Sequence, residues 1–195
     1  MKFSVSEISE LIRHRRTVRP EAFTDRVVHR EIVEKVIQNG SWAPTHGLTQ
    51  PWRFIVFSGS ARQRLADHLG EEYRRTVPGD RFMQRKFDAL TQRPMQSSVV
   101  IAIAMARDPN GKITELDELL AVACAVQNMA LTCAAYGLGS YWNTPAVAMG
   151  DGMRRFLDLG PMDRSLGLFY MGYPAGEWPR GYRKPLEQIL TWRME

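Results

Sequence analysis

The sequence predicts an α+β protein in which helices wrap a central sheet, and two observations lead to this prediction. The expected elements follow in the order helix, helix, strand, helices, strand, long helix, strand, helix, strand, which is too irregular for repeated strand–helix–strand units. The 195 residues are 44% apolar and 24% charged, a composition typical of a globular chain. At roughly 100–200 residues per domain, we expect one domain over residues 1–195, with residues 68–93 as a helical insertion.

The helices are predicted from apolar spacing and from the residues at their ends. Ser4 and Glu7 form a capping-box pattern before the first helix, which ends in a cationic run before Pro20. We expect further helices at about 29–39, 60–75, 81–92, 115–136 and 150–159. The 115–136 helix is apolar on nearly every side, so we expect it to cross the middle of the molecule.

Four apolar runs rich in β-branched and aromatic residues are predicted as strands. They lie at residues 52–57, 98–106, 138–142 and 166–173. The run at 98–106 is apolar on both of its faces, so it is expected to be a central, buried strand. These strands form the sheet that the helices wrap.

Charge and cysteine usage limit the partners and the compartment. The net charge of +5 suits an anionic partner but does not choose between a nucleotide and a polynucleotide. Cys124 and Cys133 are nine residues apart in one expected helix, about 13 Å along its axis and on opposite faces, too far for a disulfide. We therefore expect reduced thiols and a cytoplasmic protein without a secretory leader or a membrane span.

Several common catalytic motifs are missing. Gly137 and Gly139 follow a helix, and Trp142 stands where the dinucleotide fingerprint needs its third glycine. The sequence has no GxxxxGK[ST] phosphate loop and no GxSxG elbow, and its histidines and cysteines do not have metal-ligand spacing. We expect no metal and no self-sufficient set of catalytic side chains.

Four polar segments remain, and each has two interpretations. Arg15 to Arg19 fits a phosphate clamp or a solvated helix end. Ala43 to Trp52 fits recognition of a heterocycle edge or a capping loop around a core tryptophan. Tyr136 to Pro145 fits a close backbone approach to a ligand or a simple helix stop before an edge strand. Tyr182 to Glu187 fits a second cationic contact or a surface turn.

In this order the four segments resemble the nitroreductase family of FMN-dependent oxidoreductases. The resemblance covers essentially the whole chain, from Arg15-Arg16-Thr17 through Ala43-Pro44, Gln50-Pro51-Trp52 and the Gly-Leu-Gly turn to the tail. The chain is most similar to the compact members that take NADH or NADPH. The resemblance implies a mostly antiparallel sheet wrapped by helices and an intertwined homodimer with FMN held between the subunits.

The resemblance also implies three sets of site residues. One set would hold the phosphate and ribityl end of FMN: Arg15, Arg16, Thr17, Arg19 and Arg183. A second would contact the flavin ring, with the histidine reaching from the other subunit: His46, Gln50, Trp142, Asn143 and Thr144. A third would contact NADH or NADPH: Thr132, Cys133, Ala134, Ala135, Tyr136 and Gly137. Trp42 departs from the family pattern, because some compact members carry a flavin-contacting arginine there.

The implied reaction is hydride transfer from NADH or NADPH to flavin N5, then reduction of a small acceptor by a ping-pong mechanism. Nitroaromatics, quinones and enones are the expected acceptors, and residues 68–93 are expected to line or cover the site. Two alternatives stay open: a flavin-consuming or dehalogenating relative on the same fold, and a small basic nucleic-acid-binding protein. We expect neither a nucleic-acid partner nor a membrane partner, because the basic residues are dispersed among 21 acidic ones.

Overall fold

The computed structural model describes residues 3–194, and a four-stranded sheet lies at its centre. The strands are β1 (Trp52–Phe57), β2 (Val99–Met105), β3 (Gly139–Asn143) and β4 (Arg164–Gly172). They follow the order β1-β2-β4-β3, and every neighbouring pair is antiparallel. The predicted α+β class and mostly antiparallel sheet are therefore confirmed, with β1 and β3 as the edges.

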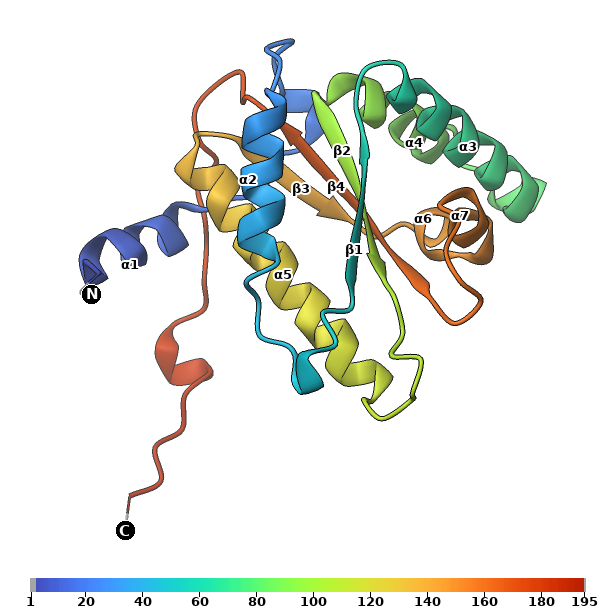
Figure 1. The fold of residues 1–195 in the computed structure, drawn as a ribbon. Helices are drawn as coiled ribbons and strands as arrows, with labels where there is room; N and C mark the ends of the chain where they lie inside the picture. Colours follow the sequence, from blue (N-terminus) through green and yellow to red (C-terminus); the bar gives the residue numbers. More distant parts are fainter. Residues whose placement is uncertain (1–2, 195) are drawn as a thin grey trace.

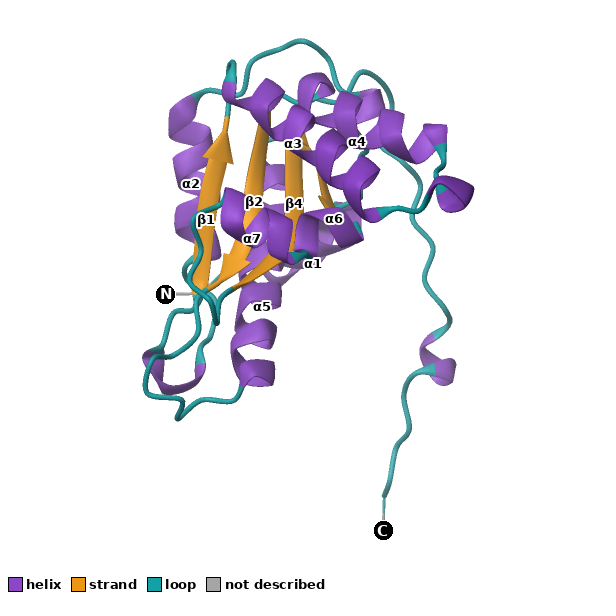
Figure 2. Cartoon of the chain, turned by 90° about the vertical axis from the view of Figure 1, so that its right-hand side faces the viewer, coloured by secondary structure: helices purple, strands orange, loops and turns teal. Residues whose placement is uncertain are grey.

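Helices cover both faces of the sheet (Figures 1 and 2). One face carries α2 (Arg30–Gly40) and α5 (Glu115–Ala135), whose buried residues form one core with the sheet. The other carries α3 (Ala61–Thr76), α4 (Gln84–Gln96), α6 (Ala146–Met149) and α7 (Asp151–Phe156), which form the second core. The predicted insertion at 68–93 is thus the end of α3, a connection and most of α4.

The long helix α5, which we expect to cross the middle of the molecule, lies over one face of the sheet against β1, β2 and β3. Its outward side leaves Leu116 64% and Leu120 52% exposed. Its length and mean hydropathy of 1.5 would suffice for a membrane span, but half of that stretch is buried in the fold. The two cysteines lie on opposite sides as predicted, with Cys124 exposed, Cys133 buried and both thiols free.

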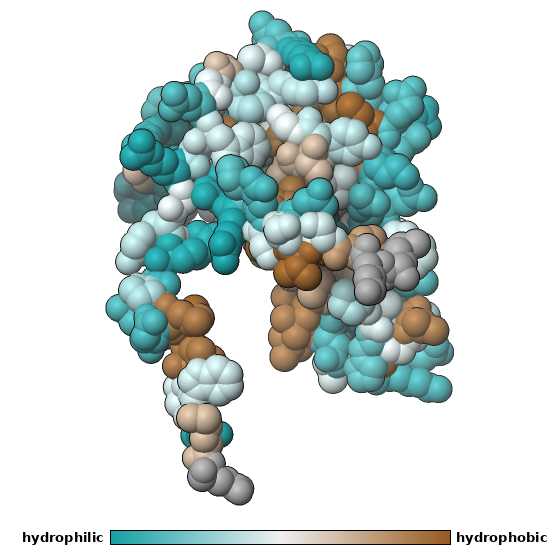
Figure 3. Space-filling model, turned by 90° about the vertical axis from the view of Figure 1, so that its left-hand side faces the viewer, coloured by the Kyte–Doolittle hydropathy of each residue, from teal (hydrophilic) through white to brown (hydrophobic). Residues whose placement is uncertain are grey.

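Both ends of the described chain project from this body (Figure 1). Helix α1 (Val5–His14) begins at Ser4, whose side chain accepts a hydrogen bond from the Glu7 backbone, and no residue of the helix is buried. After β4 the chain continues as an exposed tail with one short 3-10 turn, Leu186–Gln188. Figure 3 shows hydrophobic surface both on this tail and on the body beside it.

Candidate functional site

Three arginines from opposite ends of the chain meet beyond the last turn of α1. Arg15 follows the helix, and burial, together with the positive charges of Arg183 and Arg16, lowers the pKa of Arg15. Among the described residues no carboxylate pairs with any of the three. The Nε atoms of Arg15 and Arg16 are buried and have no hydrogen-bond acceptor. This cluster has the charge and the free donors of an anion site.

The tail brings Arg183 to this place by crossing the end of α1. The indole of Trp178 donates a hydrogen bond to the carbonyl of His14. Two residues before Arg183, a side-chain carbon on Gly181 would lie only 2.4 Å from the Arg16 guanidinium carbon. Glycine there lets the tail lie directly against the Arg16 guanidinium, and a side chain would shift that guanidinium.

The residues after the arginines run beside the edge strand β3. Thr17 forms a parallel bridge with Ser140, and the Val18 amide donates to the Ser140 carbonyl at 3.0 Å. This approach needs the glycine at 139, where a side-chain carbon would lie 2.8 Å from Val18. The first and third polar segments of the sequence are thus adjacent.

The predicted ring-contacting residues occupy the far end of β3. Trp142 donates from its indole to the Leu166 carbonyl at 2.9 Å, and the Asn143 side chain accepts from the Tyr141 hydroxyl at 3.1 Å. From Ser140 to Asn143 the strand advances about 10 Å. The arginine cluster and Asn143 therefore lie at opposite ends of one short strand, with Thr144 exposed just beyond it.

A groove of about 690 Å³ opens beside Asn143. The α3–α4 pair lines one side, and Pro145 to Gly152 line the other. Tyr73, Leu90 and Val147 are buried residues of its apolar lining. Its charged residues are Glu72, Arg75, Arg81, Lys86, Arg93 and Asp151. Part of residues 68–93 therefore faces the end of β3, which supports the expectation that this segment lines the site.

The loop between α2 and β1 lies beside the first turn of α5. His46 is exposed, and its Nδ1 lies 3.4 Å from Oδ2 of Asp117 in the first turn of α5. Three of the four positions from Gly47 to Gln50 have positive φ: Gly47 (59°), Leu48 (55°) and Gln50 (45°). Left-handed backbone at residues other than glycine concentrates at functional sites.

Within a single chain, this loop lies far from the arginine cluster. Leu11 of α1 and Thr132 of α5 line a common small cavity, whereas His46 contacts Asp117 near the other end of α5. The fifteen positions from Asp117 to Thr132 span about 22 Å of helix. Two of the predicted FMN-contacting segments are therefore separated within a single chain.

The segment predicted to contact NADH or NADPH is only partly accessible. Thr132 and Cys133 are buried, and burial raises the pKa of the Cys133 thiol. Thr132 accepts a hydrogen bond from the Asn39 side chain and donates to the Asn128 carbonyl. Ala135, Tyr136 and Gly137 are exposed at the end of α5, so they are the members of this segment that are most accessible to a ligand.

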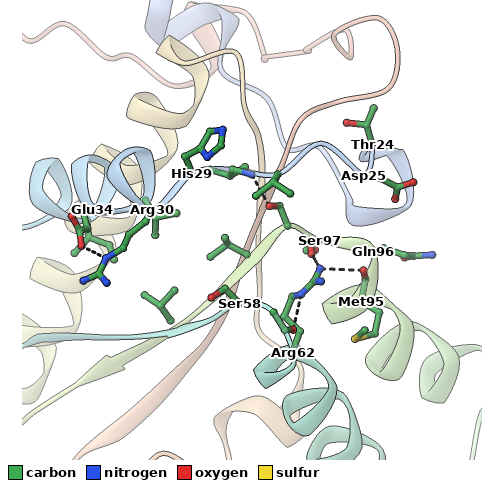
Figure 4. A pocket seen from close by; sticks show the side chains of 18 residues that line it. Thr24, Asp25, His29, Arg30, Glu34, Ser58, Arg62, Met95, Gln96 and Ser97 are labelled. Carbon is green, nitrogen blue, oxygen red and sulfur yellow. Dashed lines mark hydrogen bonds and ion pairs between the residues drawn. The ribbon is translucent and has the colours of Figure 1, made fainter.

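A second large cavity, of about 800 Å³, lies away from all of the predicted residues (Figure 4). Residues from α2, the start of α3 and the chain before β2 line it, and Arg62 donates hydrogen bonds to backbone carbonyls there. In the described part of the chain, no group of three or more histidine, cysteine, aspartate or glutamate residues could hold a metal ion.

Comparison with known proteins identifies the family. A family model described as "Nitroreductase family" matches residues 12–173. The chain belongs to the nitroreductase family. The matched range holds three of the four motif segments, and Arg183 lies beyond it. The predicted family and enzyme class are confirmed.

Two relatives show the range of similarity. The chain is 24% identical over 144 residues to the Escherichia coli K12 protein named "Putative NAD(P)H nitroreductase YdjA", covering 74% of this chain and 76% of that protein. It is 39% identical to the nitrobenzene nitroreductase of Ectopseudomonas oleovorans over 72 residues, which cover 37% of this chain and 31% of that protein.

Solved structures confirm the fold of this nitroreductase-family chain. A nitroreductase-like family protein from Bacillus cereus superposes with a TM-score of 0.83 at 24% identity, covering 99% of this chain and 98% of that one. The FMN and NADPH-dependent nitroreductase NfnB from Sphigopyxis sp. strain HMH gives 0.75 at 20% identity, covering 95% and 98%.

Sequence reasoning missed the residues that shape the site without belonging to a motif. Trp178 and Gly181 position the tail, and Gly167 lets β4 approach β3, because a side-chain carbon there would lie 2.4 Å from the Asn143 carbonyl. The groove cation Arg81 was also missed. The positive φ of 101° at Gly167 has no sequence signal beyond the glycine itself.

Proposed function

We propose that this protein is an FMN-dependent oxidoreductase that takes hydride from NADH or NADPH and passes reducing equivalents to a small electron-poor acceptor. One observation carries the proposal: Arg15, Arg16 and Arg183 converge with no carboxylate paired to them among the described residues, and two of their buried Nε–H donors have no acceptor there. A phosphate monoester supplies both the missing acceptors and the missing negative charge.

The order of the candidate residues along β3 matches the order of the parts of FMN, from the phosphate to the flavin ring. Arg15, Arg16 and Arg183 would hold the phosphate, with Thr17 and Arg19 beside them. The edge strand β3 leads from there to the predicted ring residues, Trp142, Asn143 and Thr144. Trp142 and Asn143 are already fixed by hydrogen bonds to the Leu166 carbonyl and the Tyr141 hydroxyl, so they orient a ligand without first being ordered.

The remaining residues bind, orient and exclude water. When bound, FMN supplies the N5 atom that accepts hydride. Lys86, in the groove beside Asn143, favours negative charge at that end of the site. The apolar lining from Tyr73 and Leu90 excludes water around a flat acceptor. No side chain has to act as nucleophile, which agrees with the missing catalytic motifs.

We infer that the active unit is a homodimer whose sites are completed across the interface. Helix α1 exposes Ile8 and Ile12 and buries no residue, and α5 exposes Leu116 and Leu120. The tail exposes a further apolar set: Leu186, Ile189, Leu190, Trp192 and Met194. A second copy would cover these surfaces and bring its His46 to the flavin. Gln50 would approach the ring with the same loop.

Acceptors of the proposed enzyme are nitroaromatics, quinones or enones, reduced by a ping-pong mechanism in the cytoplasm. The printed name of the Ectopseudomonas relative, nitrobenzene nitroreductase, supports the first class. The name of NfnB, which states FMN and NADPH dependence, supports the cofactor and the co-substrate. The free thiols of Cys124 and Cys133 are compatible with a reducing compartment.

Flavin titration tests the proposal. The purified protein should bind FMN with an absorbance near ~450 nm, and riboflavin, which lacks the phosphate, should bind far more weakly. Arg15→Ala or Arg183→Ala should each weaken FMN binding by about 10- to 100-fold, because each removes a charge-assisted contact. Arg13→Ala is the matched control, since Arg13 is exposed and its side chain has no partner among the described residues.

Three outcomes would contradict the proposal. Equal affinities for FMN and riboflavin would remove the phosphate role of the cluster. Loss of flavin absorbance that is not restored when an acceptor reoxidises the flavin would indicate a flavin-consuming enzyme. A protein that takes up no FMN but binds a polynucleotide would support the nucleic-acid alternative.

A further inference from the structure

The charges around the groove beside Asn143 do not balance. Glu72 pairs with Arg75 at 2.5 Å, and Asp151 pairs with Arg154 at 3.1 Å. Both acidic residues of the groove are therefore already neutralised. Arg93 is paired as well, with Glu21 at 2.8 Å.

Two cations of the groove remain without a carboxylate among the described residues, Arg81 and Lys86. Arg81 ends the short 3-10 turn that connects α3 to α4, so it sits where the two helices are joined. Lys86 lies in the first turn of α4. The groove thus presents an excess of positive charge above an apolar lining.

We propose that the groove selects acceptors that are flat, aromatic and anionic, and that Arg81 is the residue that recognises the anionic group. The apolar lining of Tyr73, Leu90 and Val147 suits an aromatic ring. A planar guanidinium matches a carboxylate or sulfonate with two parallel hydrogen bonds, whereas an ammonium does not. This inference rests on the proposed function, because it names the substrate class of the same site.

The volume of the groove agrees with such a ligand. A cavity of about 690 Å³ lies within the range of small-molecule sites and accommodates one or two fused rings with room for water. Neutral nitroaromatics would use the same apolar lining but would leave Arg81 without a partner. The expected preference is therefore for a carboxylate over its uncharged amide.

Direct binding tests the inference without turnover. The probes are 2-naphthoate and its neutral isostere 2-naphthamide, titrated by calorimetry into protein saturated with FMN. The naphthoate should bind on the order of fivefold to tenfold more tightly at low salt, and the difference should shrink as salt rises. Arg81→Gln should remove the difference, and Arg81→Lys should keep only part of it.

Arg85→Gln is the matched control, because Arg85 is exposed on α4, carries the same charge and does not line the groove. It should leave the preference unchanged. In parallel, kcat/KM is measured for 4-nitrobenzoate and 4-nitrobenzamide. In each variant, the ratio of these two kcat/KM values should change in the same direction as the ratio of the two probe affinities.

The outcomes separate this inference from the proposed function. Equal binding of the two probes to wild-type protein, or a preference that survives Arg81→Gln, would overturn the inference even if FMN binds. If the protein takes up no FMN, the two probes are titrated into FMN-free Arg15→Ala protein, in which the other anion site is weakened. An Arg81-dependent preference there would support the groove while the proposed function failed.

Discussion

The two faces of the sheet differ in how completely this chain covers them. On the α3 side the helices bury their apolar residues and turn charge outward, as with buried Leu65 and Leu69 beside exposed Arg64. On the α5 side the covering helix is apolar outward as well as inward, with Leu116 and Leu120 both more than half exposed. One chain therefore covers most of the apolar surface on the first face, whereas the second face keeps exposed apolar side chains.

The face on the α5 side also carries both separated parts of the candidate site. The arginine cluster lies near one end of α5, and His46 contacts the other end. A second copy packed on this face would bury the leucines, and it would bring its own His46 toward the arginines of the first chain. In the proposed dimer, the association of two chains would therefore complete the proposed flavin site.

A charge on the exposed side of α5 should have the largest effect. Leu120→Glu places a carboxylate in the proposed interface, and an unpaired charge buried among apolar side chains is strongly unfavourable. We expect the dimer to dissociate in sedimentation equilibrium and FMN affinity to fall with it. Arg64→Glu on α3, the matched control on the covered face, should leave both unchanged. A Leu120→Glu protein as dimeric as the wild type would show that this face is not the interface.

Mixing two variants that are each inactive at limiting FMN tests whether the sites are shared. Arg15→Ala and His46→Ala proteins are combined under conditions that exchange subunits. Each mixed dimer would have one site with both lesions and one with neither, so about a quarter of all sites should regain activity under random exchange. No recovery despite exchange verified by mass labels would contradict the shared-site model.

The difference between the faces also shows what the sequence can predict. Strands and helices were predictable because their apolar residues recur with the period of each element. The sequence showed that α5 is apolar on nearly every side, but it did not show which leucines one chain leaves exposed, because that depends on how the helix packs. The short helix α6 and the 3-10 turn at Pro20–Ala22 were missed, since neighbouring elements stabilise them more than their own sequence does.

The site was predictable only in parts. Arg15 and Arg183 are 168 positions apart, and no local pattern connects them; the family resemblance placed both at one phosphate. The contacts that bring them together, from Trp178 to the His14 carbonyl and from Gly181 to Arg16, depend on how the tail packs. The sequence predicted that residues 68–93 line or cover the site, but it could not show which cations of the groove stay unpaired, because that depends on which ion pairs form in the fold.

Thiol reactivity should distinguish the faces with a moderate effect. Cys124 is exposed on the outward side of α5 in the single chain, whereas Cys133 is buried. A bulky maleimide should therefore label Cys124 at least several-fold more slowly in the dimer than in the Leu120→Glu protein. Cys133 is the internal control, because burial raises its pKa and keeps it from reacting in either state. Equal labelling rates at Cys124 would place it outside the interface.

The covered face should show the smallest effect, a pH dependence of stability that does not need the partner. The His68 ring stacks on Phe156 with ring centres 4.1 Å apart, and its Nε2 is buried without a hydrogen bond. Burial lowers the pKa of His68 below its ordinary value of 6.5, although the nearby carboxylates of Glu72 and Glu71 act in the opposite direction. The unfolded chain therefore binds the proton at higher pH than the folded chain does. The free energy of unfolding contributed by this group is fully present above 6.5 and is lost as the pH falls through the lowered pKa.

Replacing this imidazole should flatten that pH dependence. Urea unfolding of His68→Gln at fixed protein concentration should lose less stability between pH 7 and pH 5 than the wild type, whatever the absolute cost of the substitution. His14→Gln is the control, since His14 is exposed on α1, where no residue is buried. Because His68 lies under α7 on the covered face, the same difference should persist in the Leu120→Glu background. Parallel pH profiles for His68→Gln and wild type would show that this imidazole titrates alike in the folded and unfolded chains.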